Sequence, residues 1–132
     1  MLHMLDTDMA SYIIKGRSPA IEEKVAAILP SLLCVSVMTR AELLYGLKRL
    51  PASHRLYMGV RRFLEIVRVL PWGADAADYY ADIRHQLVTT GQPIGEMDMM
   101  IAAHSLAVGA VLVTNNTKHY DRISGLVLVN WN

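Results

Sequence analysis

The sequence predicts an α/β fold in which a mainly parallel central sheet of about four to five strands is flanked by helices on both faces. Short runs of apolar and β-branched residues alternate along the chain with longer segments of helical periodicity. These short runs are almost continuously apolar, which is typical of strands that helices bury on both faces. Because the 132 residues contain no linker, repeat or low-complexity segment, we expect a single domain over residues 1–132.

Four apolar runs are predicted to be strands: residues 2–5, 32–37, 110–114 and 126–131. Six segments have the apolar spacing or the end signals of helices: residues 8–16, 18–29, 39–50, 53–70, 75–91 and 93–109. Ser18 followed by Pro19 is a strong helix start, and Gly91 and Gly109 are expected helix stops. The polar segment 115–123 is expected to be a turn.

Composition and charge exclude several classes of protein. The net charge is +1, which gives no strong indication of nucleic-acid binding, although residues 48–62 hold five Lys or Arg and no acid. The single Cys34 cannot form an internal disulfide, which favours a reducing compartment. The longest apolar stretch is interrupted by Pro30 and is too short to span a bilayer, and no cationic leader precedes the first strand. We therefore expect a soluble cytoplasmic domain that does not bind membranes.

Polar side chains recur at equivalent places of the predicted fold. Asp6 directly follows the first strand, and Glu42 and Asp98 fall in the expected first turns of two helices. Asn115 and Asn116 follow a later strand. Because the carboxyl ends of parallel strands meet at one edge of a sheet, we expect these groups to share one cleft.

Each acid also has a purely structural explanation. Thr39 and Glu42 match a capping box, and Asp98 would favour the dipole of its helix. Asp8 would cap the first helix. Taken together these explanations are less satisfactory, because two carboxylates about 4 Å apart repel by roughly 4 kcal/mol at an effective dielectric near 20. No basic residue adjoins Asp6 or Asp98 in the sequence, so a bound cation is the simplest compensation.

The donor set favours a hard divalent ion. Carboxylate and amide oxygens suit Mg²⁺ or Mn²⁺, which also keep several water ligands. The histidines are scattered without metal-ligand spacing. His104 lies on an apolar helix and is expected to be a packed or partner-facing side chain.

Four stretches together resemble the PIN-domain ribonucleases, and more closely VapC, the toxin of type II VapBC toxin–antitoxin pairs. They are "MLDTD", "VSVMTRAELLYG", "PIGEMDMMIAAHSLAVGAVLVTNN" and the terminal "LVLVNW". Each motif is weak alone, but the set occurs in order and covers nearly the whole chain. The resemblance implies a PIN-domain fold.

The resemblance assigns catalytic roles to Asp6, Glu42 and Asp98, with Asp6 and Asp98 as metal ligands. A fourth acidic position of the family is matched here by Asn116, whose amide oxygen can hold a metal or a water but supplies no charge. Asn116 leaves the number of metal ions open, and a weak second site is expected. Asp8 and Thr114 are expected to be supporting polar residues.

The implied activity is Mg²⁺- or Mn²⁺-dependent endonucleolytic cleavage of RNA, which would inhibit translation. Related toxins cut tRNA, some of them initiator tRNA, so tRNA is the expected substrate. Unpaired loops suit such an enzyme because unstacked bases can enter a cleft. Lys48, Arg49 and Lys118 are candidate contacts for the RNA backbone.

The family also implies partners. We expect a homodimer and a hetero-oligomer with a cognate VapB-type antitoxin, through which alone the pair would contact DNA. An antitoxin tail would lie in a groove lined by apolar side chains, for which core packing is the competing explanation. The candidates are Tyr12, Ile13, Leu43, Leu44, Tyr45 and Leu47.

Two other functions compete with this prediction. "LDTD" after a strand also resembles the start of a haloacid-dehalogenase-type phosphatase, with Asp6 as nucleophile and Asp8 as acid. The expected acidic pair after a later strand is absent, because Asn115 and Asn116 stand there. A PIN-fold binding module without catalysis is the second alternative, and Asn116 is its best support.

Overall fold

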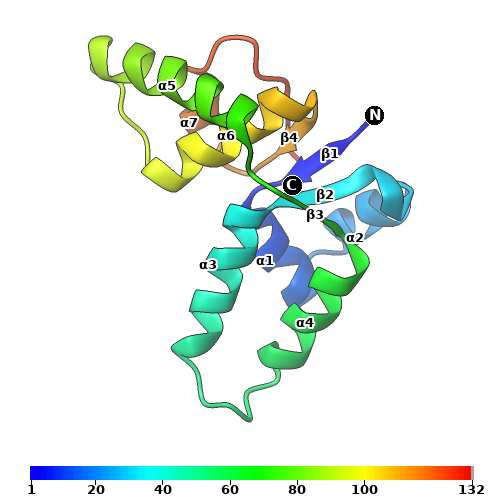
Figure 1. The fold of residues 1–132 in the computed structure, drawn as a ribbon. Helices are drawn as coiled ribbons and strands as arrows, with labels where there is room; N and C mark the ends of the chain where they lie inside the picture. The colour runs from blue at the N-terminus through cyan, green and yellow to red at the C-terminus, as the bar shows by residue number, and fades with distance from the viewer. Residues whose placement is uncertain (132) are drawn as a thin grey trace.

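A computed structural model describes residues 1–131 of the chain and shows a parallel sheet between two layers of helices (Figure 1). The five strands of the described residues lie in the order β3-β2-β1-β4-β5, and every neighbouring pair is parallel. Their bounds are β1 His3–Leu5, β2 Leu33–Ser36, β3 Arg68–Leu70, β4 Val111–Val113 and β5 Leu128–Val129. The predicted fold class is confirmed.

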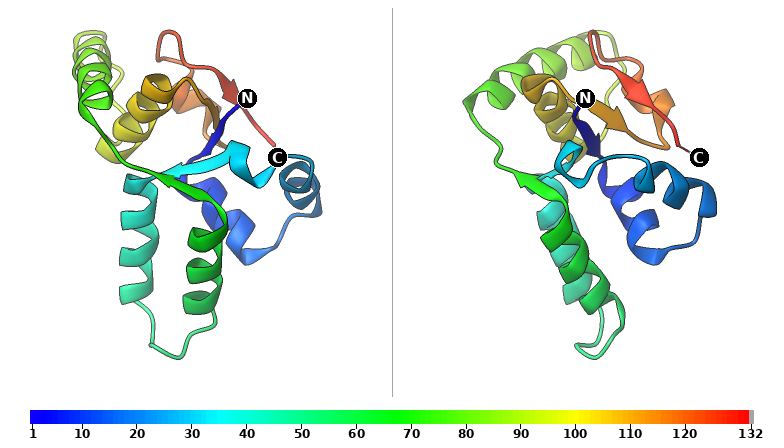
Figure 2. Two further views of the ribbon diagram at one scale, coloured as in Figure 1. Left: turned by 45° about the vertical axis from the view of Figure 1, so that its right-hand side comes forward. Right: turned by 90° about the vertical axis from the view of Figure 1, so that its right-hand side faces the viewer.

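The helices form one layer on each face of the sheet, as the three ribbon views in Figures 1 and 2 show together. On one side lie α1 Thr7–Lys15, α2 Pro19–Ala26, α3 Val37–Lys48 and α4 Leu56–Ile66, with a short 3₁₀ turn at Pro30–Leu32 before β2. On the other side lie α5 Ala74–Thr89, α6 Glu96–Val108 and the short α7 Thr117–Tyr120. The helices α3 and α4 form a hairpin that extends away from the sheet.

Alternate strand residues divide the interior into two apolar cores. Leu5, Val35 and Val113 point to the side of α1, α3 and α4 and are fully buried there. Their neighbours Met4, Cys34 and Leu112 are equally buried on the side of α5 and α6, as the period of two along a strand requires. Burial on both faces explains why the central strands read as uninterrupted apolar runs.

The prediction of one helix over residues 53–70 was wrong at its carboxyl end. Helix α4 ends at Ile66, and Val67 already has an extended backbone with ψ 153°. Residues Arg68–Leu70 form the edge strand β3, which pairs with β2. The alternating β-branched residues before Pro71 carried this signal, since proline disfavours a helical residue before it.

Three helix starts also differ from the predictions. Helix α3 is capped by Ser36, whose Oγ accepts a 3.1 Å hydrogen bond from the Met38 amide, so the predicted capping box of Thr39 and Glu42 does not form. Glu42 consequently lies in the second turn. Helix α1 is capped by Asp6 and not by Asp8, and the predicted turn at 115–123 contains α7.

The element bounds place the polar residues at one edge. Asp6, Ser36 and Thr114 each directly follow or end a parallel strand, so all three lie at the carboxyl edge of the sheet. No helix within residues 1–131 has the length and apolar character needed to cross a membrane.

Candidate active site

The strand order reverses between β1 and β4, and this is where the candidate site lies. Strands β1, β2 and β3 run outward in chain order on one side, whereas β4 and β5 occupy the other side of β1. The connections from β1 and β4 therefore diverge and leave a crevice at the carboxyl edge, which is where open α/β sheets bind ligands. Asp6 leaves β1 and Thr114 leaves β4 at this crevice.

Asp6 is held in place by hydrogen bonds to strand β4 and to the segments that follow β1 and β4. Its backbone amide donates to the Val113 carbonyl at 3.1 Å, and its Oδ1 accepts from the Met9 amide at 2.8 Å as the cap of α1. Its Oδ2 accepts a 2.5 Å hydrogen bond from the buried Thr114 hydroxyl. Thr114 Oγ1 in turn accepts a hydrogen bond from the backbone N–H of Asn116 at 2.9 Å, so the position of Asp6 is coupled to the β4–α7 turn.

The environment of Asp6 opposes its ionisation. Only 3% of the residue is exposed, and burial raises the pKa of its carboxyl from 3.8 to about 6. The hydrogen bonds from Thr114 and Met9 lower the pKa, but the charges of Asp8 and Asp98 raise it further. The three carboxylates are thus close enough to repel one another.

Asp98 enters the same crevice from the first turn of α6. Burial raises the pKa of its carboxyl, the neighbouring Tyr120 hydroxyl and His119 lower it, and Asp8 raises it again. Tyr120 lies in α7 and is 1% exposed, and its own pKa is raised by burial and by Asp98, Asp6 and Asp8. The buried Tyr120 hydroxyl therefore lies beside Asp98, although no hydrogen bond of ordinary geometry joins its oxygen to another group of residues 1–131.

Glu42 is tied to the site through Thr7. The Thr7 hydroxyl donates to Glu42 Oε1 at 2.6 Å and lies 3.1 Å from the hydroxyl of the buried Thr39. Thr7 directly follows Asp6, so this bond fixes α3 against the start of α1 and brings Glu42 to the edge where Asp6 lies.

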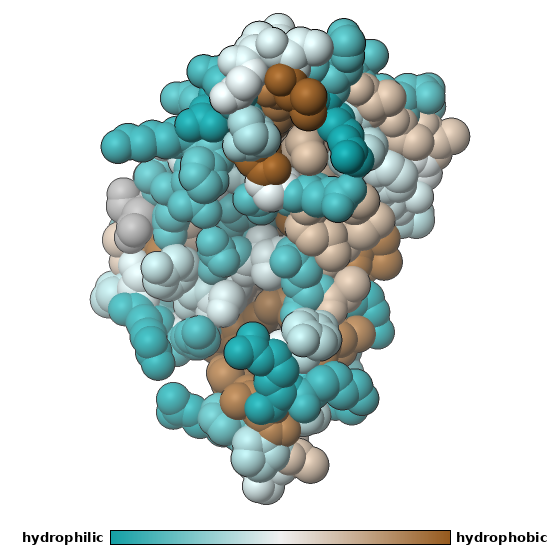
Figure 3. Space-filling view, turned by 90° about the vertical axis from the view of Figure 1, so that its left-hand side faces the viewer, coloured by the Kyte–Doolittle hydropathy of each residue, from teal (hydrophilic) through white to brown (hydrophobic). Residues whose placement is uncertain are grey.

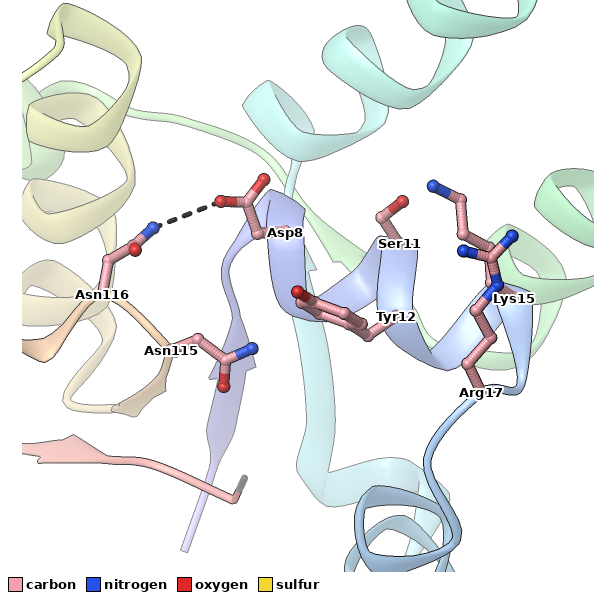
Figure 4. Close-up of a pocket in the computed structure, with 7 residues that line it drawn as sticks. All are labelled: Asp8, Ser11, Tyr12, Lys15, Arg17, Asn115 and Asn116. Atoms are coloured by element: carbon pink, nitrogen blue, oxygen red, sulfur yellow. Dashed lines mark hydrogen bonds between the residues drawn. The ribbon is translucent and has the colours of Figure 1, made fainter.

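Asp8 and Asn116 bridge the outer part of the crevice. Asn116 Nδ2 donates to Asp8 Oδ2 at 3.2 Å across the gap between the β4–α7 turn and α1 (Figure 4). Asp8 is therefore a member of the site, and Asn116 is oriented toward it.

No Lys or Arg among residues 1–131 forms an ion pair with these acids. The ion pair found in this range, Arg84 with Glu96 at 3.3 Å, lies on α5 and α6. Asp6 is buried and Asp98 is half-buried, and carboxylates in such positions without a Lys or Arg partner are chemically suited to a hard divalent ion. Within the described part of the chain, no three His, Cys, Asp or Glu side chains are gathered as a complete ligand cluster. Mg²⁺ does not require one, because it is usually bound by one or two carboxylates and keeps several waters.

Two clefts open beside the acids. The first, which we name the α1 cleft, has a volume of about 400 Å³ and is lined by Asp8, Ser11, Tyr12, Lys15, Arg17, Asn115 and Asn116 (Figure 4). The second, which we name the hairpin groove, has a volume of about 420 Å³ and lies between α1, α3 and α4. Its lining is mostly apolar, and Glu42, Thr7 and Asp8 stand at its acidic end.

Comparison with known proteins identifies the family of this chain. The family model of the PIN domain matches residues 3–126. The chain is 33% identical over 128 residues to a tRNA(fMet)-specific endonuclease VapC from Shigella flexneri and 35% identical to one from Salmonella typhimurium. Both alignments cover 97% of this chain and 96% of the relative. The chain belongs to the VapC family of PIN-domain ribonucleases.

Solved structures of this family share the whole fold. VapBC2 from Rickettsia felis, bound to a DNA fragment from its promoter, superposes with a TM-score of 0.92 at 30% identity and covers 100% of both chains. DNA-bound VapBC from Salmonella typhimurium gives a TM-score of 0.92 at 35% identity with the same coverage. The family assignment does not favour the phosphatase alternative.

The structure distributes the predicted groove residues over different surroundings. Leu43 and Leu47 line the hairpin groove, while Ile13 and Leu44 pack against the core beneath it. Tyr45 is 67% exposed on the outer side of α3 and lines neither cleft. Tyr12 lines the α1 cleft instead. Figure 3 shows apolar side chains exposed among polar ones on the lower part of the molecule, where the α3–α4 hairpin lies.

Of the predicted RNA contacts, only Arg49 lines a cleft that also holds some of the acids. Arg49 lines the hairpin groove, whereas Lys48 and Lys118 line neither cleft. The cations that border the α1 cleft are Lys15 and Arg17, which the sequence analysis did not select.

Several site residues escaped the sequence analysis. Thr7 was overlooked although it separates Asp6 from Asp8, and Tyr120 was assigned to a turn. His104 was predicted to be packed or partner-facing and is packed, 1% exposed, with Nδ1 2.8 Å from Ser36 Oγ. Thr7 had a recognisable signal in the "LDTD" motif, whereas the role of Tyr120 depends on contacts between distant segments.

Proposed function

We propose that this chain is an endoribonuclease toxin that cleaves tRNA with the help of Mg²⁺ or Mn²⁺ and thereby inhibits translation. Initiator tRNA is the first substrate to test, because relatives from Shigella flexneri and Salmonella typhimurium are named tRNA(fMet)-specific endonucleases. The free Cys34 is consistent with a cytoplasmic location, where tRNA is found.

One observation carries the proposal. Asp98 lies far along the sequence from Asp6 and Asp8, yet the charges of Asp8 and Asp98 raise the pKa of Asp6 at the strand-order reversal, Asp8 also raises the pKa of Asp98, and no described Lys or Arg forms an ion pair with these acids. Such a concentration of negative charge is unfavourable for the protein alone. It becomes favourable when a cation and a phosphate occupy the crevice together.

The residues divide into ligands and supports. Asp6 and Asp98 would hold the ion, with Glu42 acting on it directly or through a water. A bound Mg²⁺ or Mn²⁺ would supply positive charge opposite the scissile phosphate and activate a water for in-line attack. Thr114 donates to Asp6 Oδ2 and fixes its rotamer, and the buried Tyr120 hydroxyl lies beside Asp98. The hydrogen bond from Thr114 keeps the Asp6 carboxylate from turning away to relieve the repulsion.

Asp8 and Asn116 would complete the site. Asp8 adds charge, and Asn116 offers an amide oxygen for a water or a weakly held second ion, because its Nδ2 is already engaged by Asp8. The single amide at the fourth position supports one strongly held ion more than two.

The hairpin groove would receive the antitoxin. Its apolar wall includes Leu43, Leu47 and Val60, and its acidic end at Glu42 and Asp8 adjoins the catalytic crevice. An apolar segment of a VapB-type antitoxin seated there would cover the acids and prevent RNA from entering. A homodimer, a toxin–antitoxin hetero-oligomer and DNA binding through the antitoxin alone complete the proposal, and solved VapBC complexes bound to DNA support it.

Cleavage of purified tRNA tests this function. With Mg²⁺ or Mn²⁺ the purified chain should cut initiator tRNA, and Asp6→Ala or Asp98→Ala should reduce the rate by at least about a hundred-fold, because each removes a ligand of the ion. Asp78→Ala is the matched control, since Asp78 is an exposed acid on α5 outside the site. Equal cleavage by the wild type and by the Asp6 and Asp98 variants would refute the assignment.

A further inference from the structure

The α1 cleft has an acidic end and a basic end, and the catalytic proposal uses only the acidic one. Asp8, Tyr12 and Lys15 follow one another at helical spacing and line the same side of α1 (Figure 4). With a rise of 1.5 Å per residue, Asp8 and Lys15 are separated by about 10 Å along the helix axis. An extended RNA strand covers such a distance in very few nucleotides.

The basic end is created by the way α1 stops. Gly16 ends the helix in the left-handed conformation, with φ 62°, and this turn brings Arg17 next to Lys15 (Figure 4). Both side chains are exposed, and neither forms an ion pair with another described residue. Two unpaired cations beside a cluster of acids form a local dipole, which orients a bound polyanion.

An exposed aromatic side chain lies between the two ends. Tyr12 is 43% exposed and lines the cleft instead of joining either apolar core. An aromatic ring beside a basic groove is the usual platform for unstacked bases, because every base has a flat apolar face.

The opposite wall offers an unused amide. Both polar atoms of the Asn115 side chain are shut off from water and have no hydrogen-bond partner among residues 1–131. In this position the amide does not reach a ligand, but rotation of the Asn115 side chain into the cleft would replace the unpaired state with hydrogen bonds to a ligand that has both donors and acceptors. A nucleobase edge has both kinds of group, whereas a phosphate has acceptors only.

We propose that the α1 cleft binds the nucleotide next to the scissile phosphate, with its base stacked on Tyr12 and the following phosphate held by Lys15 and Arg17. The inference rests on the proposed ribonuclease function and names the residues that position its substrate. The Asn115 side chain turns into the cleft and pairs with an edge of the stacked base. The register of the RNA over the acids is thereby set by α1.

A protein partner fits this cleft less well than RNA does. Its lining is mainly polar and carries both signs of charge, whereas the neighbouring hairpin groove offers the leucine side chains that an apolar peptide needs. An antitoxin contact at Tyr12 is therefore the competing outcome of the experiment.

Binding and cleavage of the same RNA separate the possibilities. A fluorescein-labelled initiator tRNA and a labelled single-stranded RNA of mixed sequence are titrated with full-length protein in EDTA, and fluorescence anisotropy gives the Kd. Cleavage is measured separately in Mg²⁺. Tyr12→Ala should weaken binding of the single-stranded RNA by about ten-fold, the effect of losing one stacked base, and Tyr12→Phe should retain it. These substitutions remove no core side chain, and an unchanged Tm confirms folding.

Salt dependence tests the two cations. For the Lys15→Ala/Arg17→Ala variant, the slope of log K against log salt should become shallower by about 0.7 for each RNA phosphate that the protein no longer neutralises. Lys24→Ala/Arg62→Ala removes the same charge from residues that line neither cleft and should change the slope much less. Tyr45→Ala is the control for loss of an exposed aromatic ring.

The two proposals can fail independently. Wild-type cleavage with unchanged RNA binding by the Tyr12 and Lys15/Arg17 variants would overturn the α1-cleft assignment and leave the ribonuclease standing. Tyr12-dependent RNA binding without any cleavage would refute the ribonuclease function and leave RNA binding by the α1 cleft standing. Weaker capture of a VapB-type antitoxin by Tyr12→Ala, with RNA binding intact, would show that a protein occupies the cleft and would also overturn the inference.

Discussion

Replacing Asp6 by Asn should stabilise the metal-free protein at neutral pH while abolishing catalysis. The carboxyl is 3% exposed and its pKa is raised from 3.8 to about 6, chiefly by burial. A rise of this size corresponds to about 3 kcal/mol of unfolding free energy, at about 1.4 kcal/mol per pKa unit. Asn keeps the oxygen that accepts from the Met9 amide, so the cap of α1 survives.

The sign of the pH dependence follows from proton binding. Between pH 3.8 and about 6 the folded state binds more protons at Asp6 than the unfolded state does, so stability decreases as the pH rises. The contribution of Asp6 is fully favourable below 3.8 and is lost above about 6. The advantage of Asp6→Asn should therefore be near zero in acid and approach about 3 kcal/mol well above the folded-state pKa.

Urea unfolding in EDTA, at an acidic and at a neutral pH, measures this difference. At neutral pH the variant should also melt roughly 10 °C higher, given the unfolding entropy of a chain of this size. Adding Mg²⁺ should raise the Tm of the wild type and leave that of Asp6→Asn almost unchanged, because a ligand stabilises only the state that binds it. A variant that is less stable than the wild type at neutral pH, or equally affected at both pH values, would refute the argument from buried charge.

Three further predictions concern Gly46 in the hairpin groove and the buried His104. A Cβ at Gly46 in α3 would meet no atom within 4 Å, so Gly46→Ala should raise the unfolding free energy by about 0.5–1 kcal/mol in urea titrations. Because Gly46 lines the hairpin groove, Gly46→Leu should keep the fold and tRNA cleavage but weaken capture of a VapB-type antitoxin; unimpaired capture would place the antitoxin elsewhere. Burial lowers the pKa of His104 below its ordinary 6.5. As the pH falls, His104 is therefore protonated in the unfolded state before it is protonated in the folded state. The contribution of the neutral His104 to the unfolding free energy is accordingly lost as the pH falls through and below 6.5. His104→Asn can keep the bond to Ser36 and should lose less stability than the wild type over that pH range, which urea unfolding of both proteins would show; parallel losses would contradict it.

Local patterns were sufficient for the layers of this fold. Strands buried on both faces must be apolar at every position, so the runs containing Met4, Cys34 and Leu112 were recognisable without neighbours. Asp6 was recognisable as a site residue because it directly follows such a strand, whereas the cap of α1 was assigned to Asp8 and only the structure showed that Asp6 provides it. Edge strand β3 was missed because its three residues continue the apolar spacing of α4, and this spacing was given more weight than the signal of Pro71 after them.

The sequence by itself determined which segments are buried and which acids lie at strand and helix ends, because periodicity and end signals act over a few residues. Tertiary structure alone decided that β4 lies beside β1, which joins Thr114 to Asp6 across 108 residues and Glu42 to Thr7 across 35. It also decided that Lys15 and Arg17 border the α1 cleft, and that of the three predicted RNA contacts only Arg49 lines either cleft. Strand order and helix packing arise from contacts between distant segments, and a one-dimensional pattern does not contain those distances.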